Sequence, residues 1–359
     1  MRIAAYNVEN LFSRPVLFNM RDHDLAATYL QKIKEFTRLL QQESYLADKA
    51  AIEALHEEIK AYIKINIRSS KVGRNIIEKG KLKAKGRDDW DGFVDLKRER
   101  FSETAVKFTA KVIKAGKADV QCLVEVESAE TFEMFNADLL GSMFSDRLVI
   151  DGNDPRGIDI GLGSKKTFPI LSAKTNIFAR GKDGKKIFSR DCLEVEIRVK
   201  GDKSLFVLVN HFKAKDRTPA ESDAKRKSQA QEVARILTAR YDLSKDYVIV
   251  AGDLNDEPDS EPLAPLLATK GLANVWDLVE RPKDDRWTYY YGKEKAYNAI
   301  DYLLVSKALA KHITGAGIER RGMFDLAKLT GGKESSFDGM ASWRDAASDH
   351  ALIWLDADI

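Results

Sequence analysis

The chain has 359 residues, of which 44% are hydrophobic and 32% are charged, and its net charge is +3. This balance is typical of a folded globular protein and excludes a disordered or collagen-like chain. No apolar run is long enough to cross a membrane, the first residues lack a signal-peptide pattern, and two cysteines make no disulfide framework. We therefore expect a cytoplasmic protein that does not contact membranes; a monomer is the simplest expectation.

The chain starts with a strand pattern over residues 2–8, and a long charged region follows. Apolar residues recur at intervals of three and four between about residues 22 and 68, which predicts a helical hairpin or a pair of long helices. Residues 79–92 are rich in Lys, Gly and Asp, which predicts a loop. We expect residues 13–100 to form a helical, basic insertion, a cap or arm, within one domain that spans residues 1–359.

From residue 101 onward, short apolar strands alternate with helices. Helices are predicted over residues 101–115 and 220–240. Strands are predicted over residues 119–124, 147–150, 157–163, 175–179, 192–199, 204–212, 247–251, 299–305 and 351–355. So many strands interrupted by helices favour two sheets packed face to face with helices outside, which is an α+β fold with four layers, α/β/β/α.

Polar side chains that can bind metals or transfer protons stand at or near the ends of these strands. They are Asn7, Glu125 in Leu123-Val124-Glu125, Asn210-His211, Asp253 and Asn255 in Gly252-Asp253-Leu254-Asn255, Asp301 before Tyr302, and Ser348-Asp349-His350. Such groups are costly to bury without a partner. Carboxylates and amides gathered at strand ends suit a hard cation such as Mg²⁺, which prefers oxygen ligands.

In order and local context, these segments resemble the signature of the endonuclease/exonuclease/phosphatase superfamily, which has the deoxyribonuclease I-like fold. The resemblance extends from Met1 to Trp354 and is interrupted by residues 13–100. Val124 departs from it, since many members carry Gln before the Glu. The resemblance implies a divalent-metal-dependent phosphoesterase with Mg²⁺ as cofactor and Mn²⁺ tolerated.

The resemblance also implies a role for each matching residue. Glu125 would be the main metal ligand, with Asn7 and Asp349 as further ligands. Asp253 would orient or deprotonate the attacking water, and Asn255 would hold a non-bridging phosphate oxygen.

Two histidines carry the remaining roles. His350, paired with Asp301, would hydrogen-bond to the scissile phosphate and stabilise its charge. His211 would be a second phosphate contact or the acid for the leaving oxygen, and Asn210 before it is a further candidate for phosphate contact. A carboxylate beside a histidine raises imidazole basicity and fixes its tautomer.

Four further residues have two interpretations each. Arg190 resembles an arginine at the pocket edge of relatives and could bind phosphate, or it forms a surface salt bridge. Asp159 could be the carboxylate partner of His211, or a charge at a bulge or sheet edge. Lys213 and Lys215 could follow a substrate backbone, or they are solvated loop residues.

The resemblance does not select the substrate, because the superfamily includes nucleases, phosphatases and lipid-headgroup phosphodiesterases. Lys60, Lys64, Arg68 and Lys71 are spaced to form one stripe on a continuing helix, which would suit a polyanion such as DNA or RNA. A solvated helix face is the alternative. We expect a nuclease with nucleic acid as its substrate, and the alternative is a phosphatase or lipid-headgroup phosphodiesterase with the same metal site.

Overall fold

The computed structural model describes residues 1–11, 15–20, 22–98 and 104–359. The chain divides into two compact units, one made of Met1–Phe12 and Phe101–Ile359 and the other of Ser13–Arg100. Each unit has its own hydrophobic core. Among the described residues, no helix combines the length and the apolar character that a membrane-spanning helix needs.

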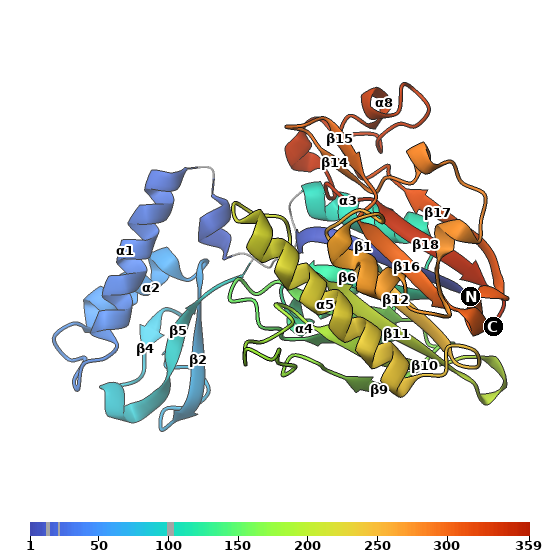
Figure 1. The fold of residues 1–359 in the computed structure, drawn as a ribbon. Coiled ribbons are helices and arrows are strands. Elements are labelled where there is room, and N and C mark those ends of the chain that lie inside the picture. The colour runs from blue at the N-terminus through green and yellow to red at the C-terminus, as the bar shows by residue number, and fades with distance from the viewer. Residues whose placement is uncertain (12–14, 21, 99–103) are drawn as a thin grey trace. The chain divides into compact units, whose positions relative to one another are not determined.

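The larger unit contains two six-stranded sheets (Figure 1). The first sheet has the order β17 (Ile313–Glu319), β18 (Leu352–Ala357), β1 (Arg2–Leu11), β6 (Val120–Val126), β8 (Asp159–Ser164) and β7 (Asp146–Ile150). The second has the order β13 (Leu272–Asn274), β16 (Asp301–Ser306), β12 (Tyr247–Asp253), β11 (Ser204–His211), β10 (Cys192–Arg198) and β9 (Ile170–Lys174). A small hairpin, β14 (Tyr289–Tyr291) and β15 (Ala296–Asn298), stands apart from both.

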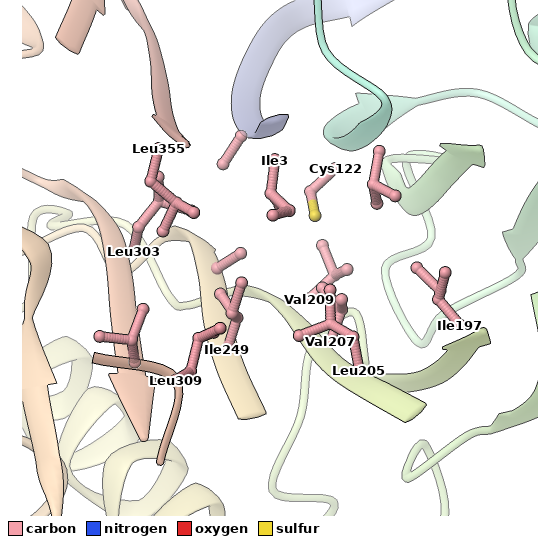
Figure 2. Close-up of a cluster of buried hydrophobic side chains, with 14 of the residues drawn as sticks. Ile3, Cys122, Ile197, Leu205, Val207, Val209, Ile249, Leu303, Leu309 and Leu355 are labelled. Carbon is pink, nitrogen blue, oxygen red and sulfur yellow. The ribbon is translucent and has the colours of Figure 1, made fainter. Parts of the chain in front are cut away.

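The main core lies between the two sheets. Alternate residues of each strand fill it, as Leu205, Val207 and Val209 of β11 do opposite Ile3 and Cys122 of the first sheet (Figure 2). The outer face of the first sheet is covered by α3 (Thr104–Gly116) and α4 (Ala129–Asp138), and that of the second by α5 (Pro219–Arg240) and α6 (Ala264–Leu267). The short helices α7 (Lys307–Ala310) and α8 (Leu326–Leu329) complete the unit. The predicted four-layer α/β/β/α arrangement is therefore confirmed.

Most predicted strands are present within a few residues of their expected bounds, but the strand predicted at residues 175–179 is wrong. The strand is β9, which ends at Lys174. The next residues turn because the backbone N–H of Asn176 donates to the Asp191 carboxylate and that of Ala179 donates to the Asn176 carbonyl. The helix predicted over residues 101–115 begins at Thr104 in the structure; residues 101–103 lie outside the described residues.

The smaller unit is mixed rather than helical. It has two helices, α1 (His23–Leu39) and α2 (Lys49–Ile59), and two short antiparallel pairs, β2 (Ile63–Ser70) with β5 (Trp90–Leu96) and β3 (Ile77–Glu78) with β4 (Lys81–Leu82). The helix expected up to residue 68 is wrong beyond Ile59, because Ile63, Ile65 and Ile67 alternate with polar residues, which is the period of a strand. The loop predicted over residues 79–92 contains β4 and the start of β5.

Candidate active site

The candidate catalytic side chains gather where strands of both sheets end. The parallel strands β1 and β6 pair Asn7 with Val124, and the parallel strands β11 and β12 pair His211 with Asp253. The antiparallel strand β16 places Asp301 opposite Asp253. Because β12 also contacts β1 and β6 across the core, the two sheets bring these strand ends to one place.

Asp253 is the most enclosed carboxylate of the group and is only 1% exposed. The side-chain amides of Asn7 and Asn255 each donate to its Oδ2 at 3.1 Å, and the backbone N–H of Asn255 donates to Oδ1 at 2.8 Å. Asn255 achieves this in a left-handed conformation, with φ of 55°, which Asn tolerates better than most residues. Burial and the negative charge of Asp301 raise the pKa of Asp253 to about 7, although the positive charge of His350 lowers it. Its carboxylate can therefore exchange a proton near neutral pH.

His350 and Asp301 form a buried ion pair, with Nδ1 of the histidine 2.9 Å from Oδ2 of the aspartate. Burial lowers the pKa of His350, but the carboxylates of Asp301 and Asp253 outweigh burial and place this pKa well above its usual value. Nε2 of the ring lies 3.8 Å from Oδ2 of Asp253. Ser348 fixes the segment, since its hydroxyl donates to the Asn7 carbonyl at 2.7 Å and accepts from the His350 N–H at 3.0 Å. His350 is thus held as an imidazolium that faces the Asp253 carboxylate.

Glu125 and His211 form the other side of the group. Glu125 stands on an irregularity of β6 with φ of 70°, and Nε2 of His211 lies 3.7 Å both from its Oε1 and from Oδ2 of Asp253. Neither distance is a hydrogen bond. Burial, together with the positive charge of Arg190, lowers the pKa of His211 well below its usual value. His211 is therefore a neutral imidazole beside two carboxylates.

Three carboxylates lie close enough to repel one another: Glu125, Asp349 and Glu9. Glu9 is exposed as a whole residue, but desolvation of its carboxylate, followed by the charges of Asp349 and Glu125, raises its pKa to about 7. Burial and the charge of Asp349 likewise raise the pKa of Glu125, while Asn7 donates a hydrogen bond to it. Glu9 accepts the Asp349 backbone N–H at 2.9 Å. A bound cation would relieve this repulsion, and the oxygen-rich donor set fits a hard divalent ion.

A second group is also close enough to hold a metal, because ligand atoms of Asp253, Asp301 and His350 lie within 4.8 Å of one another. The ring nitrogen Nδ1 of His350 is already bonded to Asp301, however, and the raised pKa of this histidine favours its charged form, which is no metal ligand. We therefore interpret this group as the proton-handling part of the site and the Glu9–Glu125–Asp349 group as its cation-binding part.

Two predicted residues lie elsewhere than expected. Asp159 is not the partner of His211: its Oδ1 accepts the Gly152 backbone N–H at 2.7 Å, while Nδ1 of the histidine has no hydrogen-bond partner. Asn210 points to the opposite face of the second sheet, since on β11 it alternates with His211 and its side chain donates to the Leu208 carbonyl. Its proposed phosphate contact is therefore wrong.

Arg190 is buried at the site, with only 3% of its surface exposed, so the surface salt bridge is excluded. Its Nε lies 3.2 Å from Oδ2 of Asp154, and its Nη1 donates to the carbonyl of Phe212, the residue after His211. Burial lowers its pKa, while the charges of Asp154, Glu125 and Asp253 raise it. Arg190 thus places a positive charge near His211 and near the carboxylates of Glu125 and Asp253.

The lysines after His211 are each paired with a carboxylate. Nζ of Lys213 lies 2.6 Å from Asp216, and Nζ of Lys215, a largely exposed side chain, lies 2.9 Å from Asp256. Both remain candidates for substrate contact, but neither is a free cation in this structure.

The four basic residues predicted to form a stripe do not share a helix face. Lys60 follows α2 and pairs with Glu57, Lys64 and Arg68 lie on β2, and Lys71 follows that strand. The register of β2 against β5 shifts between Ile67 and Ser69, so strand alternation does not place Lys64 and Arg68 on one face.

Sequence reasoning missed three contributors to the site: Glu9, Tyr289 and the Asp154–Arg156 pair. Glu9 follows Asn7 by two residues, but its φ of 47° and the register shift between Asn7 and Leu11 break the strand alternation, so no simple sequence pattern indicates its place. The ring of Tyr289 lies 4.8 Å from that of His350, and burial and the charge of Asp349 raise its pKa to about 12. Its place on a separate hairpin gave no signal in the sequence.

Comparison with known proteins agrees with this geometry. The sequence profile of the Endonuclease/Exonuclease/phosphatase family matches residues 81–319, which is more than half of the chain. The chain therefore belongs to this family, whose members are phosphoesterases. No curated protein matches the sequence.

Three solved structures illustrate the similarity of fold. Truncated Caenorhabditis elegans TDP2 is 18% identical, with 70% of this chain and 89% of that chain covered and a TM-score of 0.51. A Staphylococcus aureus beta toxin is 14% identical, with 71% and 92% covered and a TM-score of 0.51. Mannosyl-6-phosphatase Bt3783 of Bacteroides thetaiotaomicron VPI-5482 is 12% identical, with 71% and 91% covered and a TM-score of 0.50. At these identities the likeness concerns the fold alone, and it confirms the expected deoxyribonuclease I-like architecture.

Proposed function

We propose that the chain is a divalent-metal-dependent phosphodiesterase that cleaves nucleic acid. One observation carries the proposal: a carboxylate that exchanges a proton near neutral pH, Asp253, lies 3.8 Å from the imidazolium of His350. Hydrolysis of a phosphodiester needs both a base for the attacking water and a fixed positive donor for the charge on the phosphate. The two groups stand side by side, and each is held by buried partners.

Glu125, Asn7 and Asp349 are the residues we assign to the cation, with Mg²⁺ as the ion and Mn²⁺ as a tolerated substitute. The support is the chemistry of the donors, which are all oxygens, and the repulsion among Glu9, Glu125 and Asp349 that a cation relieves. When bound, the ion would supply neutralisation of charge on the phosphate oxygens.

Residues of the chain itself transfer the proton and bind the phosphate. Asp253 accepts the proton of the attacking water through its carboxylate, and Asn7 and Asn255 orient that carboxylate by hydrogen bonds. The Asn255 amide donates to Asp253 and to the Phe212 carbonyl, so its predicted contact with a non-bridging phosphate oxygen requires one of these two hydrogen bonds to open. Nε2–H of His350 donates to the phosphate, while Asp301 keeps the ring charged and oriented.

His211 contacts the phosphate as a neutral hydrogen-bond donor. Because burial lowers its pKa well below the usual value, it does not carry the extra proton that an acid for the leaving oxygen requires. Of its two expected roles, phosphate contact is therefore the better supported.

Exposed basic residues of the smaller unit support nucleic acid as the substrate, because they could bind a polyanion. Lys64, Arg68 and Lys71 are exposed, and none of them forms an ion pair with a carboxylate in the described part of the chain. Unpaired cations of this kind give sequence-independent affinity for phosphate backbones that weakens with salt.

A substrate panel tests the proposal. Plasmid DNA, RNA and a phosphomonoester are incubated with the chain and Mg²⁺ or a chelator, with Asp253→Ala as the inactive control. Metal-dependent cleavage of a polymer that the variant loses supports a nuclease. Turnover of the monoester without polymer cleavage would overturn the nuclease assignment in favour of a phosphatase.

The basic surface is tested separately. Replacing Lys64, Arg68 and Lys71 together by Glu is expected to weaken nucleic-acid binding and to flatten its dependence on salt. Unchanged affinity and salt dependence would remove the smaller unit from the binding surface.

A further inference from the structure

Asp154, on the loop between β7 and β8, contacts two arginines: Arg156 of the same loop and Arg190, which precedes β10. Asp154 accepts two hydrogen bonds from the Arg156 guanidinium, Nε to Oδ1 at 3.0 Å and Nη2 to Oδ2 at 2.8 Å. The same Oδ2 lies 3.2 Å from Nε of Arg190. The two guanidinium groups share this carboxylate, and the charges of Glu125 and Asp253 also act on Arg190.

This cluster adjoins the candidate active site on two sides. Arg190 donates to the carbonyl of Phe212, next to His211 on the second sheet. The loop itself belongs to the first sheet and packs tightly against Arg190, because a Cβ on Gly152 would lie 2.8 Å from the arginine Cα. Arg156 of this loop lies close enough to the candidate active site for its charge to act on both His211 and Glu125.

The two arginines differ in a way that suits a ligand. Arg190 is buried, and its Nε lacks a well-directed hydrogen bond despite the nearby carboxylate. The side chain of Arg156 is 63% exposed, while Asp154, whose side chain is 8% exposed, holds it in a fixed orientation. A buried arginine with an unused donor beside an exposed, pre-oriented arginine is a suitable arrangement for phosphate oxygens.

We propose that Arg156, positioned by Asp154 and backed by Arg190, binds a phosphate group of the substrate that flanks the scissile one. The inference rests on the proposed function, and it names the substrate class: an ester with a second phosphodiester beside the bond that is cut, as in a polynucleotide chain. A small diester with a single phosphate occupies the catalytic centre but not this subsite.

Arg156→Ala and Arg156→Lys test the subsite through two substrates and a binding measurement. The substrates are an oligonucleotide and bis-p-nitrophenyl phosphate, each at several salt concentrations. A bidentate arginine–phosphate contact is typically worth a factor of about 10 to 100 in binding. We expect Arg156→Ala to raise KM for the oligonucleotide at least about 10-fold more than KM for the small diester. Arg156→Lys should recover only part of this loss, since lysine lacks the planar fork.

Binding of the oligonucleotide to Asp253→Asn chains, with and without Arg156→Ala, supplies a readout independent of turnover. Losing one phosphate contact should reduce the slope of log affinity against log salt by about 1. The matched control is Arg235→Ala, because Arg235 is also exposed and bonded through Nε and Nη2 to one carboxylate, that of Glu232 on α5. It should change neither measurement.

Equal losses on both substrates, or an unchanged oligonucleotide KM and salt slope, would overturn the subsite while leaving the proposed function intact. If the unaltered chain cleaves no oligonucleotide but hydrolyses the small diester, the nuclease assignment is wrong, and so is the proposed subsite for a flanking phosphate.

Discussion

Replacing Asp301 by Asn tests the most clearly defined interaction of the site. The change keeps the shape of the side chain but removes the charge that lies 2.9 Å from Nδ1 of His350. At an effective dielectric constant of about 20, two unit charges about 4 Å apart attract by about 4 kcal/mol, which corresponds to about 3 pKa units. Burial is the largest influence on the pKa of His350 and lowers it, whereas Asp253 and Asp349 still raise it in the variant; without the Asp301 charge we expect the histidine to be neutral at pH 7.5.

The assay is hydrolysis of bis-p-nitrophenyl phosphate from pH 5.5 to 8.5, expressed as the ratio of kcat in Asp301→Asn to kcat in the unaltered chain. Asp253 titrates in both proteins; removing the Asp301 charge lowers its pKa and losing the His350 charge raises it, so the two effects oppose each other in the ratio. We expect a loss of about 10²-fold to 10³-fold at pH 7.5. The loss should shrink as pH falls, because His350 regains its proton in the variant.

Asp356→Asn is the matched control, because Asp356 also pairs with a cation, Arg2, but at the other end of β1. It should leave the ratio near one at every pH. A ratio for Asp301→Asn that stays constant across the pH range would refute the electrostatic account of His350, and so would full activity at pH 7.5.

Three further outcomes follow from the same structure. Glu125→Gln should raise the Mg²⁺ concentration needed for half-maximal activity about 10-fold or more, and an unchanged metal titration would contradict its role as the main ligand. Asp159→Asn should stabilise the fold at pH 7.5 by up to about 3 kcal/mol, because burial raises the pKa of Asp159 to about 6 and its ionisation above that pH opposes folding. The gain should vanish near pH 4 in denaturant unfolding, where the carboxyl is protonated in the folded chain; an equal gain at both pH values would refute this cause. Gly252→Ala should destabilise the fold by about 2–4 kcal/mol in the same assay, because φ is 124° and a Cβ would lie 2.0 Å from the Asn210 carbonyl oxygen.

The fold could be predicted from the sequence mainly where strands are apolar and buried. β12, with Val248, Ile249 and Val250, and β11, with Leu205 to Val209, are continuous apolar runs of strand length. β17 was missed, because its sequence Ile-Thr-Gly-Ala-Gly-Ile-Glu has two glycines and little β propensity. The smaller unit was mistaken for helix beyond Ile59, since the charges of β2 fit both a helical and a strand period.

The site could be predicted as far as short motifs place residues at strand ends. His211, Asp253, Asp301 and His350 are brought together as the motif order implied. The partner of a side chain depends on register and loop geometry, which spacing does not reveal. The bulged backbone at Glu125 and the β7–β8 loop that carries Arg156 are the features that decide these contacts, and neither has a simple sequence pattern.

The most direct test of the account is hydrolysis of bis-p-nitrophenyl phosphate by the purified chain, with Mg²⁺ and with a chelator, beside Asp253→Asn. Asp253 alone combines burial, three hydrogen bonds from Asn7 and Asn255, and a pKa of about 7. The account predicts turnover that requires the metal and falls at least about 10²-fold in the variant. Turnover that survives the chelator, or that Asp253→Asn leaves intact, would contradict the assignment of this site as a metal-dependent phosphodiesterase centre.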